Sequence, residues 1–188
     1  MDWFDDLTRS WETEYGDLDI ANLPPLVRLA RLGVLLEAFQ HDVLEPFELT
    51  PSDYGVLAAL RRAGPPYTLN PSQLYSRLRR SSGGMTKILK RLEEAGYVSR
   101  SPDPDDGRGM RVTLTDRGRS LQERVFHAFL AATTSMMAPL TSHQVEAANR
   151  SLSELLELFE QRAAERGAGD RGRQATPMTP RTGRRSSP

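Results

Sequence analysis

The chain has 188 residues, which is enough for one domain with appendages or for two small domains, and so for a sizeable hydrophobic core. It contains no cysteine, which excludes disulfides, thiolate zinc sites, thiol nucleophiles and cysteine redox sensors. The 25 basic and 25 acidic residues cancel overall, but residues 61–119 carry 13 basic and 6 acidic side chains, whereas residues 1–60 carry 3 and 12. The basic segment indicates a polyanionic partner or, alternatively, an ordinary solvated face.

The sequence has no signal for membrane insertion or export. Residues 1–6 are acidic where a signal peptide would be basic, and no run of about 18 uncharged apolar residues occurs. We therefore expect a cytoplasmic protein without a membrane partner. Because His41, His127 and His143 lack metal-site spacing and no phosphate-binding loop or nucleophile elbow occurs, we expect no metal, no cofactor and no enzyme activity.

The predicted helices begin with a long one in the segment 23–48. Its apolar residues recur at helical spacing after Pro24 and Pro25, and Pro46 should end it. Because this helix starts near residue 23, residues 1–22 are expected to form an N-terminal extension. Thr50–Asp53 carries the hydroxyl, proline and third-position carboxylate that are typical of a helix start. The sequence therefore predicts a second helix directly after residue 50.

The next two predicted helices lie close together. Asn70–Gln73 repeats the capping pattern before a short helix. Another helix is expected from Ser81 or Ser82 to Ala95, with Gly96 as its C-terminal glycine. Between them lies a turn of arginine, serine and glycine residues.

A hairpin follows these helices. Tyr97–Arg100 and Arg111–Leu114 have the composition of short strands, and the connection between them is rich in Pro, Asp and Gly. Arg108 is the long cation inside a tip that otherwise holds aspartates, so its guanidinium is expected to reach a narrow minor groove.

The C-terminal part is predicted to contain two more helices, grouped as residues 118–164. Thr115 and Thr141–Gln144 provide their capping residues. Residues 165–188 have little to bury and are predicted to be a disordered basic tail.

This order of elements predicts a winged helix-turn-helix, a mainly α fold with a small β wing, in which the helix after the turn enters a major groove of double-stranded DNA. We place the DNA-binding region at residues 49–117, which hold most of the basic segment. The residues expected to contact DNA are Ser72, Gln73, Ser81, Ser82, Gly84, Met85, Thr86, Lys87, Lys90, Arg91, Arg108 and Arg111.

Several runs of this sequence are similar to motifs of one protein family. They include Leu49–Ser52, Arg91–Val98, Asp103–Arg108 and Leu114–Gly118. Together they resemble the MarR family of bacterial transcriptional regulators over residues 23–160. The family's wing signature of Asp, Arg and Leu-Thr is present as Asp106, Arg108, Leu114 and Thr115.

The resemblance implies a homodimer of winged-helix subunits paired through the first and the last two helices. Such a dimer binds a pseudo-palindromic operator, commonly as a repressor that a small ligand releases. The outer helices also carry apolar stripes that one small winged domain does not fully cover, which independently favours a second subunit. Alternatively, these stripes form only an intramolecular core.

The resemblance further implies a small anionic or aromatic effector. The candidate lining residues are Trp11, Arg28, Arg31, His41 and Tyr54, each of which has an alternative interpretation as a surface cation or a core aromatic. Trp11 lies in an extension that resembles one in the urate-responsive branch of the family. Two of that branch's ligand positions align with Gly55 and Ile88 here, which argues against urate itself.

A second functional hypothesis belongs to another class. A winged helix can serve as a protein-interaction module without sequence-specific DNA binding, and the basic segment would then face an acidic protein. Salt-dependent binding to duplex DNA distinguishes the two hypotheses.

Overall fold

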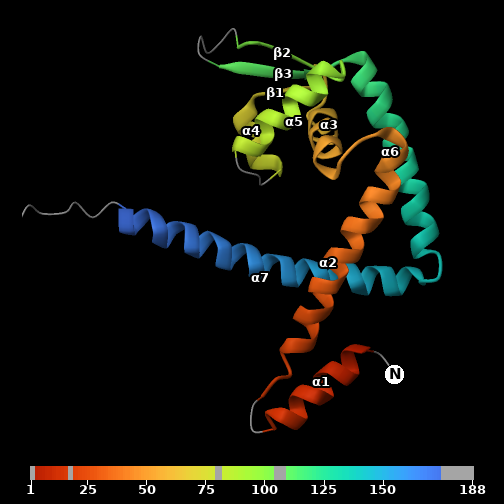
Figure 1. Ribbon diagram of the computed structural model, residues 1–188, viewed down its shortest axis with the longest axis vertical. Helices are drawn as coiled ribbons and strands as arrows, with labels where there is room; N and C mark the ends of the chain where they lie inside the picture. The colour runs from red at the N-terminus through yellow and green to blue at the C-terminus, as the bar shows by residue number, and fades with distance from the viewer. Residues whose placement is uncertain (1–2, 17–18, 79–81, 104–108, 175–188) are drawn as a thin grey trace, which may run out of the picture. The chain divides into compact units, whose positions relative to one another are not determined.

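The computed structural model describes residues 3–16, 19–78, 82–103 and 109–174. The chain divides into two compact units, residues 1–133 and 134–188. The elements in chain order are α1 (Trp3–Glu14), α2 (Leu23–Leu44), the 3-10 helix η1 (Glu45–Phe47), α3 (Pro51–Arg62), β1 (Thr68–Leu69), α4 (Pro71–Leu78), α5 (Ser82–Glu94), β2 (Val98–Pro102), β3 (Met110–Leu114), α6 (Asp116–Met137) and α7 (Ser142–Gln174) (Figure 1).

The winged helix-turn-helix consists of α3, α4 and α5 gathered against a small antiparallel sheet (Figure 1). The strand order is β1-β3-β2, and β2 pairs with β3 from Val98 opposite Leu114 to Pro102 opposite Met110. This β2–β3 hairpin is the wing. The predicted fold class is confirmed, although β1 escaped prediction because two residues are too few to show a periodicity.

A single hydrophobic core holds these elements together. It draws on the end of α2, on α3, α4 and α5, on the sheet and on the first turns of α6, and its fully buried side chains include Leu44, Val56, Leu57, Leu60, Leu74, Met85, Leu92, Val112 and Val125. Burying a Leu, Val or Met side chain contributes about 1.5–3 kcal/mol, so this core fixes how the helix-turn-helix packs.

The helix starts predicted from sequence are confirmed by their capping bonds. At α3, the Asp53 backbone N–H donates to Thr50 Oγ1 (3.2 Å) and the Thr50 N–H donates to Asp53 Oδ2 (2.9 Å). At α4, the same reciprocal pair joins Asn70 and Gln73, at 2.8 and 2.9 Å. Such boxes satisfy backbone donors that a helix otherwise leaves unpaired.

The junction between α5, β2 and α6 is unusually close. Gly96 has a left-handed φ of 71°, as expected of a C-terminal glycine, and Tyr97 N donates to Leu92 O (2.9 Å). The Thr115 hydroxyl donates to Gly96 O (2.8 Å) and accepts from Gly118 N (3.0 Å). Because a Cβ on Gly118 would lie 2.0 Å from Tyr97 O, only glycine fits there.

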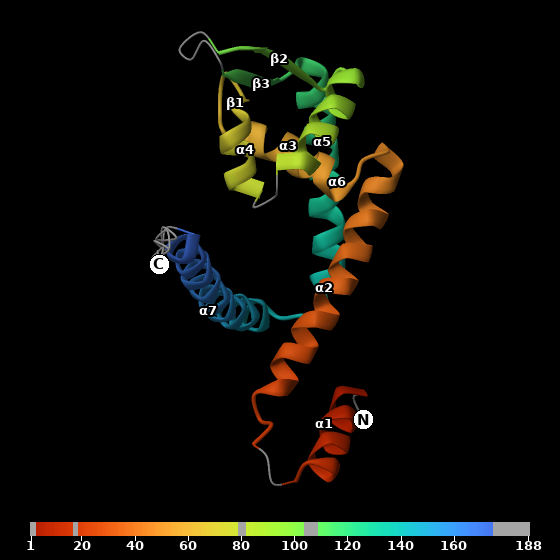
Figure 2. The ribbon, with the colours of Figure 1, turned by 60° about the vertical axis from the view of Figure 1, so that its left-hand side comes forward.

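The C-terminal part of α2 approaches α6 (Figures 1 and 2). The rings of Phe39 on α2 and Phe129 on α6 meet edge to face, with centroids 6.2 Å apart, and Tyr54 of α3 stacks on Phe129 at 5.0 Å. This aromatic trio joins the helix-turn-helix to the long helices within residues 1–133.

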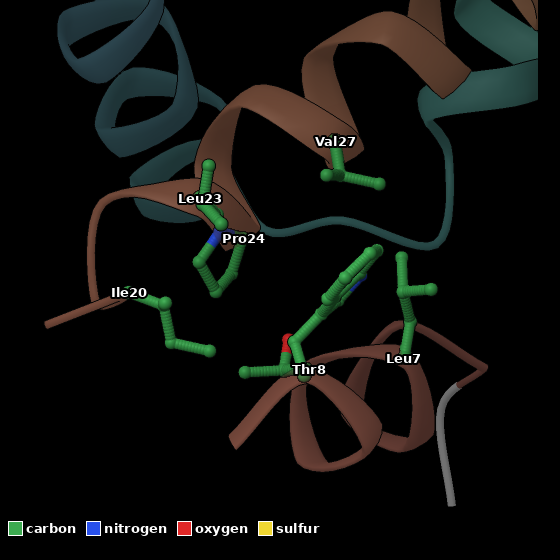
Figure 3. A pocket seen from close by; sticks show the side chains of 7 residues that line it. Leu7, Thr8, Ile20, Leu23, Pro24 and Val27 are labelled. Atoms are coloured by element: carbon green, nitrogen blue, oxygen red, sulfur yellow. The ribbon is translucent and has the colours of Figure 1, made fainter. Parts of the chain in front are cut away.

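The N-terminal extension contains a helix that the sequence did not predict, α1. Leu7 and Thr8 of α1 face Pro24 and Val27 of α2 across an apolar cavity of about 30 Å³ (Figure 3). Its volume is that of roughly one water molecule, so the cavity reflects imperfect packing between two helices.

The other unit is dominated by α7, which corrects one prediction. Residues 165–174 were expected to be disordered, but they continue the helix to Gln174. The segment has no apolar face and contains three glycines, so neither periodicity nor helix propensity indicated this continuation. The rest of the predicted tail, residues 175–188, lies outside the described residues. Within the described parts of the chain, every helix is too short or too polar to cross a membrane.

Candidate nucleic-acid interface

Helix α5 has two chemically distinct faces. Met85, Ile88, Leu89 and Leu92 are buried in the core, whereas Gly84, Thr86, Lys87 and Lys90 are exposed. The buried set follows the i, i+3, i+4, i+7 spacing of an amphipathic helix, so its packing turns the polar face outward. The exposed face is polar and cationic, which suits a helix that enters a groove of DNA.

One predicted DNA contact on this helix is wrong. Met85 was expected to face DNA, but its side chain is fully buried among the core residues. The apolar spacing already contained this signal, because Met85 begins the buried stripe.

The cations of α5 are not equivalent. Lys90 Nζ lies 3.7 Å from Glu94 Oε1, and both side chains are more than 60% exposed, so this pair is weak. Lys87 is exposed one turn earlier in the helix. Arg91, also expected at DNA, instead donates from Nη2 (2.6 Å) and Nε (3.1 Å) to Oδ1 of Asp53 on α3.

The wing carries ion pairs beside its tip and beside α5. Arg111 Nη2 lies 2.9 Å from Asp103 Oδ1, which joins the two strands next to the tip. Arg100 of β2 donates from Nε to Glu93 Oε2 (2.8 Å) and thereby lowers the pKa of that carboxyl below its usual value. Sequence reasoning missed Arg100, because only the fold brings β2 beside the end of α5.

The remaining predicted DNA contacts fall into two groups. Ser72 and Gln73 are exposed in the first turn of α4, where Gln73 also serves the capping box. Ser82 starts α5, whereas Ser81 and Arg108 lie outside the described residues.

Comparison with known proteins identifies the family. Residues 47–109 match the model of the MarR family. The chain is 30% identical to the HTH-type transcriptional regulator PecS of Dickeya dadantii over 139 residues, which is 74% of this chain and 84% of PecS. The chain belongs to the MarR family.

Further relatives agree with this MarR-family assignment. The HTH-type transcriptional repressor Rv2887 of Mycobacterium tuberculosis is 31% identical over 127 residues, or 68% of this chain and 89% of the repressor. The crystal structure of a mutant MarR from E. coli complexed with operator DNA superposes with a TM-score of 0.63 and 27% identity, covering 74% of this chain and 99% of that one.

The five predicted effector residues do not form one site in this MarR-family protein. Trp11 lines the α1–α2 cavity, His41 lines an acidic depression with Asp42, Glu45 and Glu48, and Tyr54 lines a third cleft. Arg28 and Arg31 lie on α2 and line none of these three.

Of these three depressions among the described residues, the cleft at Tyr54 combines aromatic and cationic groups. This α3–α6 cleft has a volume of about 410 Å³ and is lined by Tyr54, Ala58, Arg61, Arg62, Gln122, Glu123, Phe126 and His127. Partial burial raises the pKa of Tyr54. A hydrogen bond with Gln122 and the charge of Arg62 lower this pKa, but by less. The phenol is therefore a neutral hydrogen-bonding group at physiological pH.

Sequence reasoning missed most of this cleft. Arg61 and Arg62 end one helix, whereas Gln122, Phe126 and His127 belong to another some 60 residues later. The sequence offered one local signal, Gln122, which is a polar residue at a position of the apolar stripe of α6. The structure shows that its side chain is buried there.

Proposed function

We propose that this MarR-family member is a transcriptional regulator, not an enzyme, that binds a pseudo-palindromic operator as a homodimer. The observation that carries the proposal is the cationic face of α5 opposite its buried stripe. Thr86, Lys87 and Lys90 would meet base edges and phosphates in the major groove, and Ser72, Gln73 and Arg111 would meet phosphates beside it.

The homodimer is supported by apolar surface on the long helices. On α2 alone, six large apolar side chains are 43–59% exposed: Leu23, Leu26, Leu32, Val34, Leu35 and Leu36. This amount of exposed apolar surface on one helix is unfavourable in water unless a partner covers it. Two-fold pairing would place two α5 helices in successive major grooves, about 34 Å apart.

Binding to duplex DNA at several salt concentrations tests the proposal. Fluorescence anisotropy should show nanomolar to micromolar affinity that falls as salt rises, because phosphate contacts release counterions. Lys87→Gln should weaken operator binding and make the slope of log affinity against log salt shallower by about 1.

A matched control keeps this test specific. Arg150 is an exposed cation on α7, and Arg150→Gln removes the same charge without touching α5. The proposal fails if the two variants behave alike, or if the parent ignores duplex DNA and binds only an acidic protein.

An effector is the second part of the proposal. We infer that the α3–α6 cleft binds a small aromatic anion, because it offers the Arg62 guanidinium, the Tyr54 phenol and the Phe126 ring in one volume of drug-like size. Binding there would act as the release signal that makes the protein a ligand-responsive repressor.

Titration with benzoate provides the test of the cleft. Calorimetry should detect binding that Arg62→Gln weakens about tenfold or more, as expected when a charge-assisted hydrogen bond is lost. Arg31→Gln, on α2 and outside the cleft, should bind benzoate like the parent. Equal binding by all three proteins would reject this cleft.

A further inference from the structure

The ion pair between Arg91 and Asp53 joins α5 to α3, and the Asp53 carboxylate is itself held in place. Asp53 is 1% exposed, and its Oδ2 accepts from Thr50 N (2.9 Å) and from Thr50 Oγ1 (2.7 Å). Its other oxygen, Oδ1, accepts two bonds from Arg91, at 2.6 and 3.1 Å. Both carboxylate oxygens are therefore used, one to cap α3 and the other to hold α5.

We propose that Arg91 is a positioning residue: its bond to the buried Asp53 sets the rotation at which α5 presents Lys87 to base edges in DNA. The inference rests on the proposed DNA-binding function. It changes the role expected of Arg91 from a DNA contact to the group that orients the contacting side chain.

The apolar face of α5 does not set this rotation alone. Packing of Met85, Ile88, Leu89 and Leu92 is non-directional and tolerates small rotations, whereas a two-donor bond to a carboxylate requires a defined geometry. Arg91 and Lys87 are four residues apart and lie on the same side of the helix. Fixing one of them therefore fixes the other.

Small rotations matter at the helix surface. A rotation of about 10° moves a side chain that is roughly 5–6 Å from the helix axis by about 1 Å. A shift of that size disrupts a hydrogen bond to a base edge, whose distance range is only about 0.5 Å wide. Attraction to phosphates persists, because it falls off slowly with distance.

The ion pair between Arg100 and Glu93 also contacts α5 and can be compared with the one between Arg91 and Asp53. Arg100 of β2 holds Glu93 at the end of α5, but both side chains are about one-third exposed, at 33% and 34%, and neither is part of a cap. The Arg91 side chain is itself 53% exposed, but its partner Asp53 is buried and held by the cap of α3. Because neither Arg100 nor Glu93 has such a fixed partner, we expect this pair to constrain α5 much less than the one with Asp53.

The test compares Arg91→Lys with Arg100→Lys in the full-length protein. Each variant keeps its charge but loses the forked donor geometry of arginine. The probes are a duplex selected by the parent protein from a randomised pool and a scrambled duplex of the same composition.

We expect Arg91→Lys to lose about tenfold in affinity for the selected duplex, with unchanged affinity for the scrambled one and an unchanged salt slope. Arg100→Lys should stay within about twofold of the parent on both probes. Asp53→Asn should reproduce the loss, and the double variant Asp53→Asn/Arg91→Lys should lose no more than the weaker-binding single variant.

Two results would overturn the inference while leaving the proposed function intact. One is that Arg91→Lys keeps the parent's ratio of affinities for the selected and the scrambled duplex. The other is a parallel loss on both duplexes with a shallower salt slope, which would make Arg91 a phosphate contact. If the parent binds neither duplex, the proposed function itself fails, and this inference with it.

Discussion

The close approach of two backbone segments at Gly118 makes a sharp prediction. In Gly118→Ala the new Cβ would lie 2.0 Å from Tyr97 O and 2.9 Å from Leu114 Cδ1. Ordinary carbon–oxygen contacts begin near ~3.3 Å, so the start of α6 must move away from Tyr97 by more than about 1 Å. Such a movement stretches the Thr115 N–H bond to Tyr97 O, now 3.1 Å, beyond hydrogen-bonding range.

The expected loss of stability follows from these contacts. Overpacking costs about 1–3 kcal/mol, and each of the two lost Thr115 bonds, to Tyr97 O and to Gly96 O, costs about 1 kcal/mol. The better helix propensity of alanine offsets about 1 kcal/mol. The net loss is about 2–4 kcal/mol in the free energy of unfolding, equivalent to a decrease in Tm of about 4–16 °C for a chain of this length.

Urea denaturation followed by circular dichroism measures this loss, with all proteins at one concentration because dimer stability depends on it. The matched control is Gly84→Ala, whose Cβ meets nothing within 4 Å and should leave stability unchanged or raise it by up to about 1 kcal/mol. Stability of Gly118→Ala within about 0.5 kcal/mol of the parent would refute the steric argument.

Three further predictions concern other parts of the molecule. Leu35→Glu places a charge on the exposed apolar face of α2, so sedimentation should show a shift from dimer to monomer; an unchanged dimer would remove this face from the interface. Thr115→Ala removes the cap of α6 and should cost about 1–2 kcal/mol in urea denaturation, whereas Thr115→Ser should cost less. Because burial raises the pKa of Tyr54, its contribution to stability is complete below the unfolded pKa of 10.0 and is lost as pH rises through the higher folded value. In an ultraviolet titration, the Tyr54→Phe variant should lack one phenol whose pKa lies above 10.0. If the phenol that disappears has a pKa of about 10, the raised pKa of Tyr54 is contradicted.

The features that the sequence predicted correctly are local ones. The capping boxes at Thr50 and Asn70 and the glycine at residue 96 depend on side chains within a few residues of the backbone groups that they serve. Their patterns are therefore visible in the sequence, and they delimited α3, α4 and α5 closely enough to predict a winged helix-turn-helix.

Periodicity was less reliable where two interpretations competed. Met85 fits both the start of a buried stripe and a DNA-facing turn, and core packing decided for burial. Residues 165–174 have no apolar periodicity and contain three glycines, yet they continue α7, so neither local signal indicated this part of the helix.

By itself, the sequence determined where the helices after α1 begin, that residues 61–119 are cationic and that the chain resembles the MarR family. The tertiary structure decided which side chains meet: Asp53 and Arg91 are 38 residues apart, and Tyr54 and Gln122 come from different helices of one cleft. The physical reason is the range of the interactions. Caps and helical stripes act over a few residues, whereas an ion pair or a cleft between helices exists only after the core has packed those helices together.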